Sequence, residues 1–431
     1  MSLFNDGKTG TRETSRKTCP TVNANFLDED IKVGKMSRII QHIVVMLCNH
    51  NSWFGLLCNT LSRPLVRHGN RALIGNSSFL PVFVFCLLFF VIPDSVCLAK
   101  SPYINKVYEY YPAPGQFVNV LPEYEKGDDA NMMRLKAEES IADNNQVMIT
   151  LGGWGGYVVF GFDHMVQNIK GEYDFIVLGN AFYASSNPNS DAGKGGSCEP
   201  GIVCVSYDAN GNGKPDDEWF EIAGSEYGNK STYLDYQLTY YRPAAEHVAT
   251  PDKEHKDLID TTYIAWQDNK GHKGYMNQLS YHTQPYFPQW LSEDELTFNG
   301  TRLPDNYKDE SGEGTYYVLY AYPFGYADNH PNNTEEAKLK IDWAVDTKGQ
   351  PVNLPGIHFV KVYTGVNQQC GWLGETSTEI LGATDLHPDA PEQGFDPIVN
   401  CKSSIRKVLI GSHLYILHGT EVYSVIGTKI E

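Results

Sequence analysis

The sequence lacks the short motifs that mark common hydrolases and structural zinc sites. No two cysteines are separated by two residues, and neither a Gly-x-Ser-x-Gly elbow nor a His-Glu-x-x-His pair occurs. Structural zinc sites, α/β-hydrolase nucleophiles and zinc-protease helices depend on those spacings. The residue pattern therefore identifies no catalytic centre, and we expect a binding protein rather than an enzyme.

Positive charge is scarce beyond residue 99. Residues 100–431 hold 24 lysines and arginines against 46 aspartates and glutamates, whereas residues 1–99 hold ten against six. The longer segment therefore carries a charge of −22 within a chain total of −18. A surface this negative repels phosphate backbones, so we expect no nucleic-acid partner, and it favours cations.

Long stretches rich in alanine, leucine, glutamate and lysine are also scarce. From residue 100 to 386, short β-branched and aromatic runs alternate with Gly, Pro, Asn and Asp, which is typical of strands and turns. Strands are expected over residues 156–162, 173–178, 201–207, 315–320, 339–345 and 357–363, and one helix over 129–142. This pattern predicts an all-β domain, residues 100–386, built as a β-sandwich.

Residues 79–99 have the pattern of a secretory signal peptide. Phe79 to Ile92 is an almost unbroken apolar run, too short for a comfortable bilayer span, and arginines precede it. Cys97 and Ala99 supply the small residues expected before a cut at Lys100, and a lipoprotein-type cut before Cys97 is the alternative. Residues 1–78 show no domain pattern, and we expect them to be disordered or to precede the true start of translation.

A segment rich in Pro, Asp and Gly, residues 387–402, predicts a linker to a short C-terminal β module, residues 403–431. Apolar runs beginning at Lys407, Leu414 and Val422 predict three short strands there, with glycines at the turns. This is too little chain for a large core, so we expect an accessory module.

An exported protein permits disulfides, and four cysteines lie beyond residue 99. They are Cys198, Cys204, Cys370 and Cys401. The first two are close enough in sequence to bridge across a tight turn, but four cysteines allow three full pairings, so the sequence leaves the pairing open.

The sharpest local motif is an acidic loop that starts at Asp208. Oxygen-bearing side chains at Asp208, Asn210 and Asn212, with Gly213 at the bend, match the first half of a calcium-binding loop. Alternate side chains of a tight loop can converge on one centre. The spacing therefore predicts one structural calcium ion.

The second half of this loop would complete the calcium sphere. Lys214 would supply its backbone carbonyl, and carboxylates would follow from Asp216, Asp217 and Glu218. The usual closing glutamate is replaced by Trp219. A hairpin turn without metal, which needs only residues that accept positive φ, is the alternative.

Aromatic and acidic residues suggest where a ligand could bind. Trp154 and Trp372 lie in glycine-rich segments expected to be loops, where they could stack on a flat ligand, although either could instead be a core residue. Glu375 and Glu379 could form the carboxylate pair of a glycoside hydrolase. Nothing in the sequence places that pair across a cleft.

Longer stretches carry a resemblance. They are Lys106–Phe117, Gly155–His164, Gly171–Phe182, Glu199–Val203, the Asp208 loop, Gly325–Asn329 and Tyr363–Glu375. Together they resemble the "cell surface protein" family of Bacteroidetes over residues 106–387. The resemblance implies an exported, lectin-like jelly roll without known catalysis, and it adds Asn329 and Glu375 to the candidate ligand-binding residues.

The resemblance also implies a role. Some relatives lie near corrinoid-uptake genes, which implies capture of a ligand such as cobalamin, with an outer-membrane uptake partner. Residues 422–431 resemble the sorting tail of the type IX secretion route. We expect an exported, calcium-stabilised cell-surface protein that binds a small molecule or glycan, and a secreted glycoside hydrolase using Glu375 and Glu379 is the alternative.

Overall fold

The computed structural model describes residues 100–187, 189 and 191–390, together with four C-terminal strands. The expected segments 1–78 and 79–99, and residues 391–402 of the expected linker, lie outside the described residues. Among the described residues, no helix is long and apolar enough to cross a membrane.

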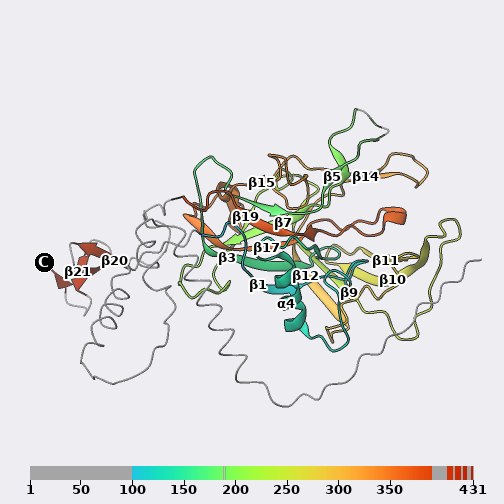
Figure 1. The fold of residues 1–431 in the computed structure, drawn as a ribbon, viewed down its shortest axis with the longest axis horizontal. Helices are drawn as coiled ribbons and strands as arrows, with labels where there is room; N and C mark the ends of the chain where they lie inside the picture. The colour runs from blue at the N-terminus through green and yellow to red at the C-terminus, as the bar shows by residue number, and fades with distance from the viewer. Residues whose placement is uncertain are drawn as a thin grey trace, which may run out of the picture. The chain divides into compact units, whose positions relative to one another are not determined.

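A six-stranded antiparallel sheet forms the centre of the domain (Figure 1). In spatial order its strands are β1 (Lys106–Tyr111), β3 (Tyr157–Gln167), β17 (Gly356–Thr364), β7 (Gly201–Ser206), β8 (Trp219–Ile222) and β16 (Ala344–Val345). Successive side chains of a strand point to opposite faces. One face of this sheet builds the main core, while the other face carries both apolar and charged residues and packs part of a smaller cluster around Ile202 and Tyr363.

The core face is made of aliphatic and aromatic residues such as Val158, Phe160 and Val362, all fully buried. Helix α4 (Ala130–Ile141) packs against this core through Met133, Ala137 and Ile141. Their spacing of four residues places these side chains in one stripe along the helix. The carboxylate of Asp129 caps the helix by accepting the backbone N–H of Met132 at 2.8 Å.

A second sheet has a core of its own. Its strands in order are β11 (Lys273–Leu279), β10 (Leu258–Asp268), β9 (Tyr233–Tyr241) and β12 (Glu295–Arg302). Trp154, Tyr240 and Phe298 are central to this core. Gly155 has a φ of +87°, and a Cβ there would lie 2.4 Å from the Cβ of Phe298. The glycine-rich segment around Trp154 is thus required by close packing.

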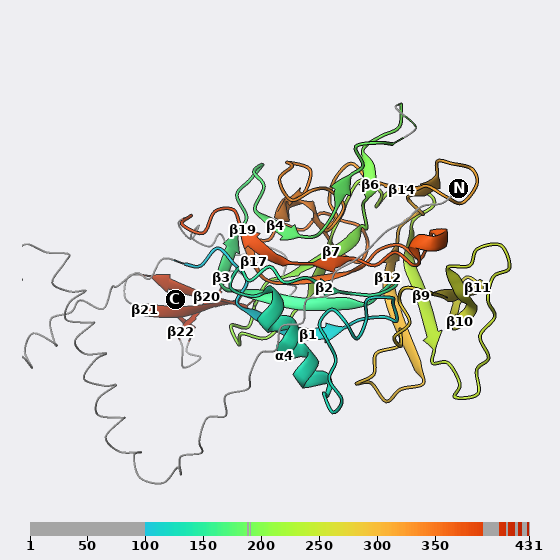
Figure 2. The ribbon, with the colours of Figure 1, turned by 45° about the vertical axis from the view of Figure 1, so that its right-hand side comes forward.

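Three smaller sheets complete the domain. One contains β13 (Tyr307–Asp309), β14 (Tyr317–Tyr320), β6 (Gly195–Ser197) and β5 (Phe182–Tyr183). The others contain β15 (Lys338–Leu339), β4 (Phe175–Leu178) and β19 (Gly382–Asp385), and β18 (Glu379–Ile380) with β2 (Ile149–Thr150). Figure 2 labels β6 and β14 of the first of these sheets at the base of a projecting loop.

The expected C-terminal strands are present. They are β20 (Ile405–Ile410), β21 (His413–His418) and β22 (Glu421–Ser424), and a fourth strand, β23 (Lys429–Ile430), joins the same antiparallel sheet. The alternating apolar runs therefore located this sheet, and only its shortest strand was missed.

The prediction of a β-rich fold is confirmed, including the helix and most of the expected strands. Residues 339–345 are an exception, because β15 ends at Leu339 and a 3₁₀ helix, Ile341–Trp343, precedes β16. The buried carboxylate of Asp174 accepts the backbone N–H of Ile341 at 2.7 Å, which holds this turn. The strands are divided among several sheets rather than between two large ones, so the finer expectation of a jelly roll stays a proposal.

The sequence left the cysteine pairing open, and in the structure no bridge joins Cys198 to Cys204. Both thiols are free, as is that of Cys370. Residues 201–206 form the extended strand β7, and such a strand rises about 3.3 Å per residue, which carries Cys204 away from Cys198. Cys401 lies outside the described residues.

Candidate functional site

A groove of ≈ 1060 Å³ crosses the face of the six-stranded sheet that is opposite the core. We call it the sheet groove. One residue from each of the six strands contributes to its floor. In strand order these are Glu109, Val159, Lys361, Cys204, Glu221 and Val345. Each is the direct cross-strand partner of the next, so their side chains form one continuous row on one face.

The middle of the floor carries a lysine without an acidic partner. The Nζ of Lys361 lies 3.9 Å from the centre of the Tyr157 ring, and Lys361 forms no ion pair among the described residues. The hydroxyl of Tyr157 donates to the carboxylate of Glu109 at 2.9 Å. Cation–π contact fixes the ammonium group while leaving its N–H donors available to a ligand.

Toward the other end of the floor, next to Val345, lies a half-buried carboxyl group, Glu221. It accepts a hydrogen bond from the hydroxyl of Thr301 at 2.7 Å, and burial raises its pKa to about 7. Beside it, burial and the Glu221 charge raise the pKa of the Cys204 thiol. A thiol held in its protonated form is a poor nucleophile, so this cysteine serves packing rather than covalent chemistry.

The walls of the groove come from loops and from the second sheet. They include Tyr227 and Leu234 before and within β9, Thr301 of β12, and the tight turn at Gly349. Pro215, from the Asp208 loop, also lines the groove. The conformation of that loop therefore sets the position of one wall.

The Asp208 loop is a compact, exposed turn. The Asp208 carboxylate accepts backbone N–H groups from Gly211 at 2.7 Å, Asn212 at 3.1 Å and Gly213 at 2.8 Å. Gly211 and Gly213 have φ values of +72° and +70°, which glycine adopts without strain. This curl is the shape that a calcium-binding loop requires.

The predicted metal ligands do converge in part. The side-chain amides of Asn210 and Asn212 both donate to Asp216, at 3.1 and 3.0 Å, and Asn210 also donates to Asp217 at 3.2 Å. The amide oxygens of Asn210 and Asn212 accept the backbone N–H groups of Asn212 and Lys214 at 3.0 and 2.8 Å. The loop is therefore closed by its own hydrogen bonds, and calcium binding stays a prediction.

Two other predicted ligands, Lys214 and Glu218, do not point to the same centre through hydrogen bonds to Asp216. The backbone N–H of Lys214 donates to Asn212 at 2.8 Å, and Glu218 is exposed. Glu218 is therefore the predicted ligand for which the loop provides least support.

Two of the predicted ligand-binding residues are built into the fold. Trp154 is fully buried, its indole N–H donates to the carbonyl of Thr301 at 3.2 Å, and Tyr236 packs edge-on against it. Asn329 is also fully buried, and its amide pairs with both backbone groups of Tyr322 at 2.8 Å. Asn329 is thus held inside the fold, whereas Trp154, although buried, also lines a small cavity.

The other two lie on one projecting loop. Trp372 is 39% exposed at the tip of a short 3₁₀ helix, Gly371–Leu373, and its carbonyl accepts the hydroxyl of Tyr281. Glu375, at the base of this loop, is 4% exposed and lines a second, smaller cavity. The structure therefore brings Trp154 and Glu375 together at this cavity, whereas Trp372 and Asn329 lie elsewhere.

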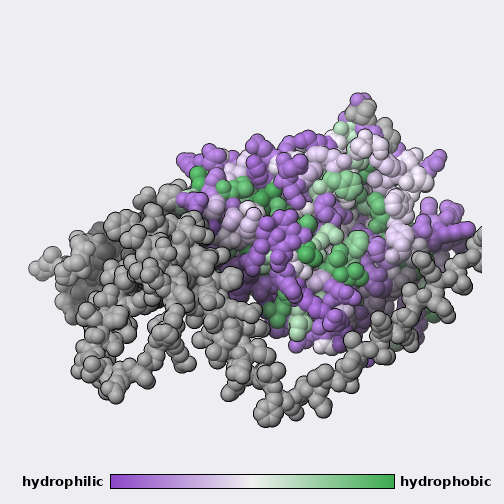
Figure 3. All heavy atoms as spheres, viewed as in Figure 1, coloured by the Kyte–Doolittle hydropathy of each residue, from purple (hydrophilic) through white to green (hydrophobic). Residues whose placement is uncertain are grey.

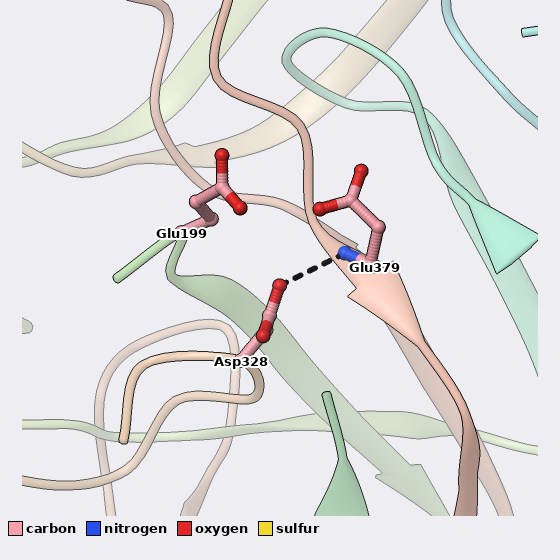
Figure 4. A group of neighbouring side chains, drawn as sticks. All are labelled: Glu199, Asp328 and Glu379. Atoms are coloured by element: carbon pink, nitrogen blue, oxygen red, sulfur yellow. Dashed lines mark hydrogen bonds between the residues drawn. The ribbon is translucent and has the colours of Figure 1, made fainter. Parts of the chain in front are cut away.

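A further group of three carboxyl groups lies in the interior. The ligand oxygens of Glu199, Asp328 and Glu379 all lie within 4.8 Å of one another (Figure 4). Asp328 accepts backbone N–H groups from Asn180, Ala181 and Glu379 at 2.7–3.0 Å. This residue therefore joins three segments of chain.

Burial makes negative charge unfavourable in this group. Burial and repulsion from neighbouring carboxylates, Glu379 first, raise the pKa of Glu199 far above its ordinary value, and a hydrogen bond links the two. Burial also raises the pKa of Glu379, although the hydroxyls of Ser377 and Thr150 donate to it. Such a group could hold a cation, and hydrogen bonds from the surrounding chain already reach Asp328 and Glu379.

The glycoside hydrolase alternative gains no geometric support. It requires two carboxyl groups on opposite sides of a cleft. Glu375 lines the smaller cavity, whereas Glu379 lines neither that cavity nor the sheet groove and is bonded within the carboxyl group just described. The two side chains do not face one open space.

Sequence reasoning missed the sheet groove. Its floor residues are spread from Glu109 to Lys361, and only strand pairing brings them into one row. The one available signal was a charged residue at an alternate position of a strand otherwise rich in valine, as at Lys361. Comparison with models of known protein families and with curated protein sequences finds no match.

Proposed function

We propose that this chain is an exported cell-surface binding protein that captures its ligand in the sheet groove. The observation that carries the proposal is the floor of the groove, where one row of residues presents Lys361 between two carboxyl groups. Sites for small molecules commonly enclose about 300–1,000 Å³ and contain a few convergent polar groups among apolar walls. A volume of ≈ 1060 Å³ suits a large ligand, such as a corrinoid or a short glycan.

The floor chemistry favours a ligand with both donors and acceptors. Lys361 donates, while Glu109 accepts, and Glu221 can do either because its pKa lies near neutrality. The amide side chains of a corrinoid such as cobalamin and the hydroxyls of a glycan both have this character. The face of the domain in Figure 3 is mainly hydrophilic with small hydrophobic patches, which also favours a polar ligand over a broad apolar partner.

Calcium stabilises the protein in this proposal rather than taking part in chemistry. The ion binds in the Asp208 loop and holds the groove wall to which Pro215 belongs. The six-stranded sheet and the sheet β15–β4–β19, which share one core, form the two layers of the expected jelly roll. An outer-membrane uptake partner would receive the captured ligand.

Calorimetric titration of the purified chain with cobalamins and with glycans tests the proposal. Lys361→Met keeps the length of the side chain and removes its donors, so affinity for the true ligand should fall about tenfold, equal to about 1.4 kcal/mol. The matched control is Lys256→Met, because Lys256 is exposed and lines neither the sheet groove nor the smaller cavity. Equal affinity in the two variants would show that the ligand binds outside the sheet groove. Hydrolysis of a glycan by the wild-type chain, abolished in Glu375→Gln, would instead favour the glycoside hydrolase.

A further inference from the structure

The smaller cavity is separate from the sheet groove and shares no lining residue with it. Its volume is ≈ 220 Å³, and we call it the Glu375 cavity. Residues from four parts of the chain enclose it: Gly153 and Trp154, the β10–β11 hairpin, the segment after β12, and residues 366–376. The size is below that of sites for drug-sized ligands, so the cavity suits a single small ring.

The floor of the cavity holds a carboxyl group that is only half satisfied. Oε1 of Glu375 accepts the backbone N–H of Gln116 at 2.6 Å, whereas Oε2 is buried and has no hydrogen-bond partner among the described residues. A buried polar atom without a partner is rare in folded proteins, because it has lost water and gained nothing in exchange. A ligand hydroxyl that reached Oε2 after a small shift of the Glu375 side chain would supply the missing hydrogen bond.

Burial raises the pKa of Glu375 to about 8, so this group is mainly protonated and uncharged at neutral pH. The nearest other acid in the lining, Asp305, is paired with Arg302 at 2.6 Å. The cavity therefore offers neither a free negative charge for a cation nor a free positive charge for an anion. A neutral ligand fits best.

The rim is aromatic. Trp266, which is half-buried, lies over Gly274 of the neighbouring strand, where a Cβ would come within 2.6 Å of the indole. The absence of a side chain at Gly274 fixes the indole beside the opening. Tyr275 and Tyr307 are 49% and 37% exposed and also line the cavity. Exposed rings around a polar floor can stack on the C–H face of a ring whose hydroxyls point inward.

Amide groups supply further donors and acceptors. Asn367 and Gln369 line the cavity beside Gln368. Gln368 is fully engaged with Asn306 and Thr376 at 2.7–3.0 Å, so it shapes the wall rather than binding. This leaves Glu375 and the two neighbouring amides to contact hydroxyl groups.

We propose that the Glu375 cavity is a second ligand site, which binds one neutral polyhydroxylated ring such as a pyranose sugar. Glu375 bonds to a hydroxyl through Oε2, and Trp266 stacks on the apolar face of the ring. The site is independent of the sheet groove, so the failure of either proposal leaves the other standing. The ring can be a free sugar or the end unit of a glycan.

Titration of the full chain with a panel of neutral methyl pyranosides, observed by calorimetry and ligand-detected NMR, tests this site. At least one neutral member should bind, while glucosamine and glucuronic acid should not. Oligosaccharides that end in the bound sugar are then titrated in the same way. If the site binds the end of a glycan, these oligosaccharides should bind more tightly than the methyl glycoside. If it binds a free sugar, they should not.

Variants locate the binding. Trp266→Ala and Glu375→Met should each weaken affinity for that sugar about tenfold or more, since each removes one principal contact. Glu375→Gln should recover part of the loss, because its amide can still accept from Gln116 and donate to a hydroxyl. Phe182→Ala, another exposed aromatic that lines neither hollow, is the control and should change affinity less than about twofold.

Unfolding curves establish whether each variant is folded. If Glu375→Met does not fold, Trp266→Ala still tests the proposal. If no neutral sugar binds at millimolar concentration, if only charged sugars bind, or if affinity survives both Trp266→Ala and Glu375→Met, the proposal is wrong. Loss of sugar binding in Lys361→Met would instead move the sugar to the sheet groove.

Discussion

At the scale of single residues, buried carboxyl groups distinguish this domain. Glu221, Glu375 and the group around Glu379 are all withdrawn from water, and burial is the largest cause of the raised pKa in each. A carboxyl group that keeps its proton in the folded state makes stability depend on pH in the direction opposite to that of a salt-bridged acid.

Glu221 allows this dependence to be measured. Its folded pKa is about 7 against an ordinary 4.5, so the folded chain holds this proton more tightly than the unfolded chain does. The stabilising contribution is complete below the unfolded pKa and is lost as pH rises through the folded pKa. Glutamine does not titrate, so the Glu221→Gln variant does not lose stability in this way as pH rises. The difference in unfolding free energy between variant and wild type should therefore grow in favour of the variant by up to about 3 kcal/mol between about pH 5 and about pH 8.

Urea unfolding at a series of pH values measures this difference. Glu246→Gln, a substitution at an exposed glutamate, serves as the control and should follow the wild-type curve. Parallel curves for wild type and Glu221→Gln would show that burial of this carboxyl group has little effect on its proton affinity.

Gly155 should be required both because no side chain fits beside Phe298 and because its φ is positive. Gly155→Ala introduces a Cβ only 2.4 Å from Phe298 at a φ of +87°, so we expect a loss of at least about 2 kcal/mol of unfolding free energy. Gly171→Ala is a matched control, because its φ is +83° and nothing lies within 4 Å of the added Cβ. Equal losses in the two variants, measured by urea unfolding, would refute the packing argument.

At the scale of elements, the Asp208 loop and the sheet groove are connected through the β7–β8 hairpin. The loop joins the two strands that carry Cys204 and Glu221, and its Pro215 lines the groove. A cation that stiffens the loop would therefore stiffen one wall of the groove.

Calcium should raise the melting temperature, and a chelator should lower it. With calcium at about a hundred times its dissociation constant, binding adds about 2.7 kcal/mol. Asp208→Ala should abolish the difference, because Asp208 organises the loop through three backbone N–H groups.

A second Asp turn provides the comparison. Asp309 accepts the backbone N–H groups of Ser311 and Gly314 at 3.0 and 2.7 Å. Asp309→Ala should lower the melting temperature equally with and without calcium. If a demetallated wild-type sample melts at the same temperature with and without calcium, the Asp208 loop is a hairpin turn only.

At the scale of the whole molecule, the charge distribution and the apolar run are consistent with export. The −22 charge of residues 100–431 follows a basic segment and the run from Phe79 to Ile92. Secreted material should therefore begin near Lys100, which N-terminal sequencing determines. A full-length chain retained in the cytoplasm would contradict this prediction.

Local pattern was sufficient for much of the fold. β-branched and aromatic runs bounded by turn residues are a local property, as is the helical spacing of apolar residues, so the sequence alone located β3, β7, β17 and the helix α4. Where a segment changes its partner midway, local pattern fails: residues 339–345 divide because β15 pairs with β4 and β16 pairs with β8.

The sites depended on the tertiary structure. Whether Trp154 stacks on a ligand or fills a core is decided by β9 and β12, which pack around it, and not by the glycines beside it. The row from Glu109 to Glu221 and the group of Glu199, Asp328 and Glu379 join residues far apart in the chain. Their proximity is set by strand register, which burial of one sheet face fixes over the whole domain. The sequence by itself determined which segments become strands, whereas long-range pairing decided which polar residues meet.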